Sequence, residues 1–204
     1  MTHRHVVIAG NGRSGTTFLV HLFTALGIDT GFTEESAQSS IDPLSNAGLE
    51  FNLFRPDYEN LPYIIKSPFF YKVADEILNN PKIEIENILI PIRKLEDAAK
   101  SRIRIQSLAE EKAQKTIREG LVPGGITGTN DKAEQELVLA RQINELIISV
   151  AESEVPYTFI SFPLLVTNPH YLYKKIGFLI PEIKFDTFLE VFTKISKPEL
   201  VHEF

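Results

Sequence analysis

The chain has 204 residues, of which 43% are hydrophobic and 24% are charged, and it contains no cysteine. This length and composition suit one globular domain with a sizeable core, so residues 1–204 are expected to form a single domain. The absence of cysteine excludes disulfides and thiolate metal sites, and the formal net charge of −6 argues against nucleic-acid binding, which needs a basic face.

No long apolar run indicates a signal peptide or a membrane span, so the cytoplasm is the expected location. An apolar run at 5–9 predicts the first strand, and large apolar residues at helical spacing predict a helix at about 18–26. The stretch between them, Gly10-Asn-Gly-Arg-Ser-Gly-Thr-Thr17, predicts a phosphate-binding loop. In such a loop, glycines let backbone N–H groups close around phosphate oxygens at the positive end of the helix dipole.

This loop departs from that of a nucleotide triphosphatase, which reads G-x-x-x-x-G-K-[ST]. Gly10 and Gly15 fit the glycine spacing, but Thr16 stands at the lysine position and the cation lies three residues earlier, as Arg13. The sequence therefore predicts a loop that holds an anion without the usual ATP-binding lysine.

Later in the chain, β-rich runs predict strands at 62–66, 87–92 and 157–162, with a further strand at about 29–32. Helical patterns are found at 69–79, 94–118, 131–153, 169–177 and 186–195. The alternation predicts an α/β fold with a parallel sheet flanked by helices on both faces, similar to P-loop NTPases. In such folds, ligands bind at the carboxyl ends of the strands.

Two segments break this alternation, at 41–61 and at 120–130. The second has four glycines among eleven residues, which makes rearrangement cheap. We expect both segments to line the pocket for a substrate, and the second to act as a lid that orders when ligand binds.

Cations follow two of the predicted strands, where a triphosphatase would place an aspartate that holds Mg²⁺. The run at 87–92 ends before Arg93, and the run at 62–66 ends in Lys66. Ser101 follows Arg93 by eight residues, so a helix beginning between them brings its hydroxyl near the arginine, where both could meet a phosphate. Taken alone, the same pair also fits an arginine at a sheet edge and an ordinary helical serine.

Taken together, these motifs resemble the sulfotransferases that use 3′-phosphoadenosine 5′-phosphosulfate. Gly12-Arg-Ser-Gly-Thr-Thr17 is similar to that family's 5′-phosphosulfate loop, and Arg93 with Ser101 is similar to its 3′-phosphate motif. Ile65-Lys-Ser-Pro-Phe69 is similar to the Lys-Asp-Pro-Phe segment of tyrosylprotein and glycan sulfotransferases, whose lysine is catalytic. The resemblance implies these donor-binding residues: Gly12, Arg13, Ser14, Gly15, Thr16, Thr17, Arg93 and Ser101.

By analogy with phosphoryl transfer, the reaction needs three roles: to hold the transferring group, to neutralise the leaving oxygen and to deprotonate the acceptor hydroxyl. Arg13 would hold the transferring group, and Lys66 would neutralise the leaving oxygen, since a cation there becomes more favourable as charge builds up. Glu34 lies 21 residues after Arg13, an offset similar to that of the glutamate base in tyrosylprotein sulfotransferases, with Glu35 as a substitute. The alternative is that Glu34 and Glu35 are exposed acids at a helix start. The histidines lack metal-ligand spacing, so no metal site is predicted.

The sequence thus favours metal-independent, in-line transfer of a sulfuryl group from 3′-phosphoadenosine 5′-phosphosulfate to a hydroxyl, with 3′-phosphoadenosine 5′-phosphate as product. A small molecule, a lipid or a glycan would fit as acceptor. The main alternative is a P-loop small-molecule kinase with a degenerate Walker A loop. A third is a nucleotide-binding protein that has lost catalysis, which would keep Arg93 and Ser101 without needing Glu34 or Lys66.

Overall fold

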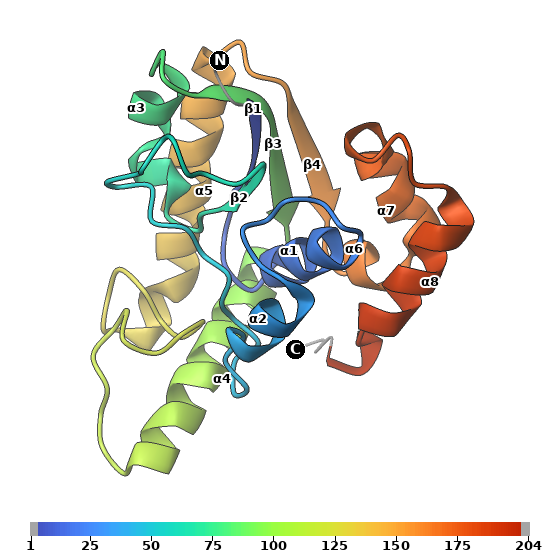
Figure 1. Cartoon of the computed structure of the whole chain (residues 1–204). Coiled ribbons are helices and arrows are strands. Elements are labelled where there is room, and N and C mark those ends of the chain that lie inside the picture. The colour runs from blue at the N-terminus through green and yellow to red at the C-terminus, as the bar shows by residue number, and fades with distance from the viewer. Residues whose placement is uncertain (1–3, 201–204) are drawn as a thin grey trace.

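The computed structural model describes residues 4–200, in which strands alternate with helices along the chain (Figure 1). In chain order, with η for 3₁₀ helices, the elements are β1 (Arg4–Ile8), α1 (Thr16–Ala25), α2 (Glu34–Ser39), β2 (Ile64–Lys66), η1 (Phe70–Lys72), α3 (Ala74–Leu78), β3 (Glu84–Ile92), α4 (Leu95–Ala113), η2 (Lys132–Glu134), α5 (Gln135–Glu152), β4 (Tyr157–Ser161), α6 (Leu164–Thr167), α7 (Pro169–Ile176), η3 (Gly177–Leu179), α8 (Phe185–Ile195) and η4 (Pro198–Leu200).

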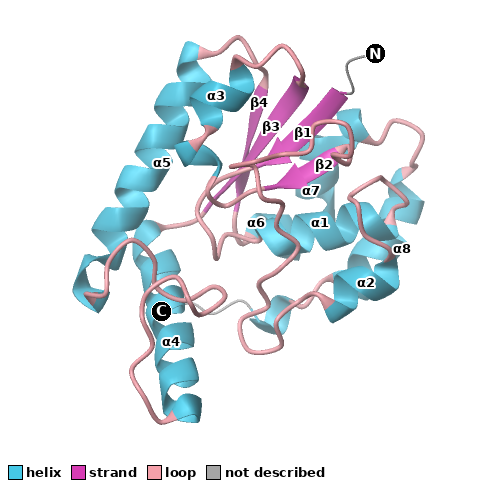
Figure 2. Ribbon diagram, turned by 60° about the vertical axis from the view of Figure 1, so that its left-hand side comes forward, coloured by secondary structure: helices cyan, strands magenta, loops and turns pink. Residues whose placement is uncertain are grey.

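The four strands of the described chain form one parallel sheet in the order β2-β1-β3-β4, which Figure 2 shows as a twisted layer. β1 is a central strand, and its Val7 lies opposite Ile65 of β2 and Ile88 of β3. Parallel neighbours need crossover connections, and each connection here contains at least one helix. The loops that follow β1, β2 and β3 therefore leave the same edge of the sheet.

Each face of the sheet is covered by its own hydrophobic core. Val6 and Ile8 pack into a core with α1, α6, α7 and α8, whereas Val7 and Ala9 pack into a core with η1, α3 and α5. This division follows from the two-residue period of a strand, and burial on both faces explains why β1 is a continuous apolar run. Figure 1 shows α7 and α8 on one side of the sheet and α3 and α5 on the other.

The predicted fold class is confirmed, as an α/β fold with a parallel sheet flanked by helices on both faces. The strands predicted at 5–9, 62–66, 87–92 and 157–162 correspond to β1, β2, β3 and β4, with ends that differ by up to three residues. None of the helices of residues 4–200 is both long enough and apolar enough to cross a membrane.

The strand predicted at 29–32 is wrong, because the segment turns instead of extending. Gly31 has a φ of 71°, and its N–H donates to the carboxylate of Asp29 at 3.0 Å. The other Asp29 carboxylate oxygen accepts from the N–H of Tyr63 at 3.1 Å. The segment therefore meets the start of β2 through one aspartate rather than through a strand ladder.

The predicted helices are present with changed ends. The helix predicted at 94–118 stops at Ala113, because Gln114 takes a left-handed conformation with a φ of 51°. The helix predicted at 69–79 is divided into η1 and α3 at Val73, whose φ of −127° is not helical. Sequence patterns did not predict the short helix α6, and they gave a helix start at α2 only as the alternative interpretation of Glu34 and Glu35.

Candidate active site

The phosphate-binding loop predicted between β1 and α1 is a tight turn at the N-terminus of α1. Arg13 and Gly15 both have positive φ, of 72° and 88°, so the chain reverses direction within a few residues. A Cβ on Gly15 would lie 2.7 Å from a methyl group of Leu165, so no larger residue fits there. Ser14 is fully buried, and its hydroxyl donates to the carbonyl of Asn11, which ties the loop to itself.

The structure brings Arg13, Arg93 and Ser101 together, although they come from different elements. The Nε of Arg13 donates to the Ser101 hydroxyl at 3.1 Å, and its Nη1 donates to the carbonyl of Ser45. Arg93 donates from Nη1 to the carbonyl of Arg13 at 3.1 Å, and its guanidinium lies 4.7 Å from the ring centroid of Phe162. Arg93 and Ser101, which the sequence analysis paired, thus each contact Arg13, the first at its main-chain carbonyl and the second at its guanidinium.

Lys66 lies at the carboxyl end of β2 and is 2% exposed. Its ammonium group donates to the Thr17 hydroxyl at 2.8 Å, to the Gly48 carbonyl at 2.6 Å and to the Glu50 carboxylate at 2.9 Å. Burial lowers the pKa of Lys66, and the ion pair with Glu50 opposes that shift. The ammonium group therefore touches Thr17, the last residue of the predicted phosphate-binding loop.

Arg102 is a further cation of this cluster that sequence reasoning missed. Its Nη1 donates to the carbonyl of Gly125 at 2.6 Å, while its buried Nε has no hydrogen-bond partner in the described structure. Its Nη2 would lie 2.5 Å from a Cβ on Gly12, so the guanidinium packs directly against the loop. The available signal was its position next to Ser101, but an arginine inside a helical pattern is ordinarily read as a solvated surface residue.

Positive charge is therefore concentrated in one buried region of an acidic chain. Burial, followed by the charge of Arg93, lowers the pKa of Arg13 to about 10, and Asp42 has a smaller opposing effect. Burial, followed by the charge of Arg13, likewise lowers the pKa of Arg102 to about 10. Cations that lower one another's pKa in a poorly solvated site stabilise an anion placed between them.

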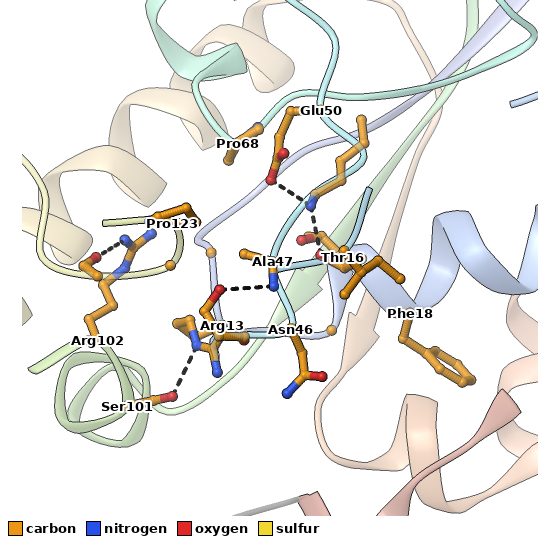
Figure 3. Close-up of a pocket in the computed structure, with 18 of the residues that line it drawn as sticks. Arg13, Thr16, Phe18, Asn46, Ala47, Glu50, Pro68, Ser101, Arg102 and Pro123 are labelled. Atoms are coloured by element: carbon orange, nitrogen blue, oxygen red, sulfur yellow. Dashed lines mark hydrogen bonds and ion pairs between the residues drawn. The ribbon is translucent and has the colours of Figure 1, made fainter. Parts of the chain in front are cut away.

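These side chains border a cavity of about 670 Å³. Figure 3 shows Arg13 beside Ser101, with Arg102 directed toward the segment that carries Pro123 and with Glu50 on the far side of the cavity. The predicted site residues that line the cavity are Gly12, Arg13, Gly15, Thr16, Thr17, Lys66, Arg93 and Ser101. Parts of the segments at 41–61 and 120–130 line it as well.

No family model matches the chain, and no curated protein matches its sequence. Among solved structures, it is similar to the sulfotransferase domain from the Synechococcus PCC 7002 olefin synthase, with a TM-score of 0.53 and 15% sequence identity. The match covers 97% of this chain and 82% of that one. This chain therefore shares its fold with that sulfotransferase domain.

The structure separates Glu34 from the other predicted site residues. Glu34 begins α2, is exposed, and forms an ion pair with Lys194 of α8 at 3.3 Å. Neither Glu34 nor Glu35 is among the described residues that line the cavity. A capping box between Thr33 and Ser36 fixes this helix start, which matches the alternative interpretation of exposed acids in a first helical turn.

Glu50, rather than Glu34 or Glu35, is the carboxylate that lines the cavity, and sequence reasoning missed it. Its segment has no regular secondary structure, and no spacing within the chain links Glu50 to Lys66. Within residues 4–200, no cluster of three or more His, Cys, Asp and Glu side chains is arranged to hold a metal ion.

Proposed function

We propose that this chain is a sulfotransferase that moves a sulfuryl group from 3′-phosphoadenosine 5′-phosphosulfate to an acceptor hydroxyl and releases 3′-phosphoadenosine 5′-phosphate. One observation carries the proposal: Arg13, Lys66, Arg93 and Ser101 all line a single cavity at the N-terminus of α1. A donor with two separate phosphate positions requires two anion sites. The loop with Lys66 supplies the first, and Arg93 with Ser101 supplies the second.

The backbone N–H groups from Gly12 to Thr17 and the Arg13 guanidinium would hold the 5′-phosphosulfate. Arg93 and the Ser101 hydroxyl would hold the 3′-phosphate. The hydrogen bond from Arg13 to Ser101 connects the two anion sites, so a ligand that fills both would join groups that already contact each other. The unpartnered Nε of Arg102 provides one more buried donor beside the loop.

In sulfuryl transfer, the oxygen that leaves sulfur must be stabilised, and at this site a side-chain cation rather than a metal ion would do this. As the acceptor oxygen bonds to sulfur, the bond between sulfur and the bridging oxygen breaks, and negative charge develops on the leaving phosphate. Lys66, buried and in contact with Thr17, is placed to stabilise that charge in the transition state. β2 ends in Lys66, and Arg93 follows the last residue of β3, where a Mg²⁺-dependent enzyme has an aspartate, which supports transfer without a metal.

We also propose that the chain forms one domain, since both hydrophobic cores share the same sheet. The acceptor would be a small alcohol, a lipid or a glycan. It would enter between the segment at 41–61 and the loop at 120–130, which carry much of the cavity wall outside the cation cluster.

Ligand binding tests this proposal directly. Without Mg²⁺, 3′-phosphoadenosine 5′-phosphate should raise the melting temperature, whereas 5′-AMP, which lacks the 3′-phosphate, should bind much more weakly. Mg²⁺-dependent ATP binding with no response to the bisphosphate would support a small-molecule kinase instead. Labelled donor with a panel of alcohols, phenols, lipids and sugars would then show whether transfer occurs. Bisphosphate binding without transfer would leave a nucleotide-binding protein that lacks catalysis.

A further inference from the structure

The cavity contains a carboxylate whose position suits proton removal from an acceptor. Among the described residues that line the cavity, Glu50 is the single aspartate or glutamate. Its side chain is 40% exposed, in contrast to Lys66, whose side chain is 2% exposed. Glu50 is thus both accessible from the cavity and bonded to the cation that we assign to the leaving oxygen.

The backbone around Glu50 is anchored on both sides. The N–H of Phe51 donates to the carbonyl of Lys66 at 2.8 Å, and the carbonyl of Gly48 accepts from the ammonium group of Lys66 at 2.6 Å. Gly48 has a φ of 141°, and a Cβ on it would lie 2.3 Å from the Ser40 carbonyl oxygen. These contacts hold Glu50 beside the end of β2 and limit its movement.

The two carboxylate oxygens of Glu50 have different surroundings. Oε1 accepts from the ammonium group of Lys66 at 2.9 Å. Within residues 4–200, no hydrogen bond to Oε2 is found, which leaves this oxygen for a hydroxyl group bound in the cavity. A base must lie within hydrogen-bond reach of the proton that it removes, and a carboxylate with one occupied oxygen and one accessible oxygen satisfies that requirement.

We propose that Glu50 is the general base of the sulfuryl transfer, an inference that rests on the proposed function. The acceptor hydroxyl gives its proton to Glu50 while its oxygen forms a bond to sulfur. The electron pair of the breaking bond between sulfur and the bridging oxygen remains on the 5′-phosphate of the leaving nucleotide. Lys66 contacts Glu50 on one side and the phosphate-binding loop on the other, so it aligns the base with the leaving group.

Two other residues compete for this role. Glu34 is exposed and paired with Lys194, outside the cavity lining. His21 lines the cavity, and burial lowers its pKa, so it is neutral at neutral pH and able to accept a proton. However, it lies one helical turn beyond Thr17, and within the described chain neither of its ring nitrogens is hydrogen-bonded to Lys66.

The test compares Glu50→Gln on two acceptors, benzyl alcohol and para-nitrophenol, at mildly alkaline pH. Benzyl alcohol must lose its proton during transfer, whereas para-nitrophenol is already ionised. Turnover with benzyl alcohol should fall by about 10²- to 10⁴-fold, the usual contribution of a positioned base. Turnover with para-nitrophenol should stay within a few-fold of wild type, and the affinity for 3′-phosphoadenosine 5′-phosphate should be unchanged.

The difference between acceptors separates a base from a residue that only holds Lys66 in place. If Glu50→Gln lowers turnover equally with both acceptors, Glu50 is structural and the inference is overturned. It is also overturned if Glu50→Gln stays active while the matched variant His21→Gln or Glu34→Gln loses activity with benzyl alcohol alone. Wild-type protein that neither binds 3′-phosphoadenosine 5′-phosphate nor transfers to any member of the acceptor panel contradicts the proposed function itself, so the two failures are distinguishable.

Discussion

The two halves of the cavity are built in different ways. The donor half takes Lys66 and Arg93 from the carboxyl ends of β2 and β3, Arg13 from the loop between β1 and α1, and Ser101 from α4, so each lies at or next to an element that the sheet holds in place. The other half comes from segments without regular structure, which contribute Glu50 and the carbonyl of Gly125. The order of the strands fixes the positions of the residues in the donor half. The irregular half, formed by the segments without regular structure, is attached to the donor half by individual hydrogen bonds.

The largest expected effect would break the donor half. Arg93→Ala should weaken binding of 3′-phosphoadenosine 5′-phosphate by about 30- to 3000-fold, which corresponds to about 2–5 kcal/mol for loss of one partner of a buried charge pair. The loss should be far smaller for 5′-AMP, because that ligand lacks the 3′-phosphate. Titration calorimetry with both nucleotides measures the two losses. Equal losses would show that Arg93 contacts another part of the nucleotide.

A smaller effect is expected from Gly48→Ala, which tests how firmly the irregular half is attached. The added methyl group would collide with the backbone at Ser40, so we expect a loss of about 1–3 kcal/mol in the free energy of unfolding. Gly177→Ala is the matched control, since Gly177 has a φ of −57° and open space around its Cα. Urea unfolding gives both values. Equal stability of the two variants would show that the backbone around Gly48 rearranges to accommodate the added methyl group at little cost in free energy.

The smallest effect concerns the glycine-rich loop at 120–130. If the irregular half closes over bound nucleotide, amide hydrogen exchange in this loop should slow by about tenfold when 3′-phosphoadenosine 5′-phosphate is added. Arg102 donates to the carbonyl of Gly125 in this loop, so an anion bound at the loop after β1 would affect the loop at 120–130 through Arg102. Exchange in α7, which contributes no residue to the cavity lining, serves as an internal control. Unchanged protection at 120–130 would make the loop a plain connection.

The fold could be predicted to a large extent, because apolar runs and helical periodicity report burial directly. Lys66 and Arg93 could be placed at one edge of the sheet, since parallel strands bring their carboxyl ends together. The strand expected at 29–32 was wrong, because the local hydrogen bond of Asp29 outweighed a weak β pattern.

Residues that act through tertiary position were harder to predict than those in the loop motif. Glu50 is fixed beside Lys66 by backbone hydrogen bonds, which any residue type provides and which leave no pattern in the sequence. Arg102 belongs to an ordinary helical sequence, and its burial depends on how α4 packs against the glycine-rich loop. Neither fact follows from residue spacing.

Two of the hydrogen bonds that join the donor half to the irregular half affect which residues of the cavity can change during evolution or engineering. Arg13 and Lys66 both donate to main-chain carbonyls of the same segment, those of Ser45 and Gly48. Because a carbonyl oxygen is supplied by every amino acid, these two anchoring contacts do not themselves depend on the side chains of the segment. Ile41 and Ala47, which line the cavity, are therefore natural positions at which a library of substitutions could redirect acceptor choice without rebuilding the donor machinery.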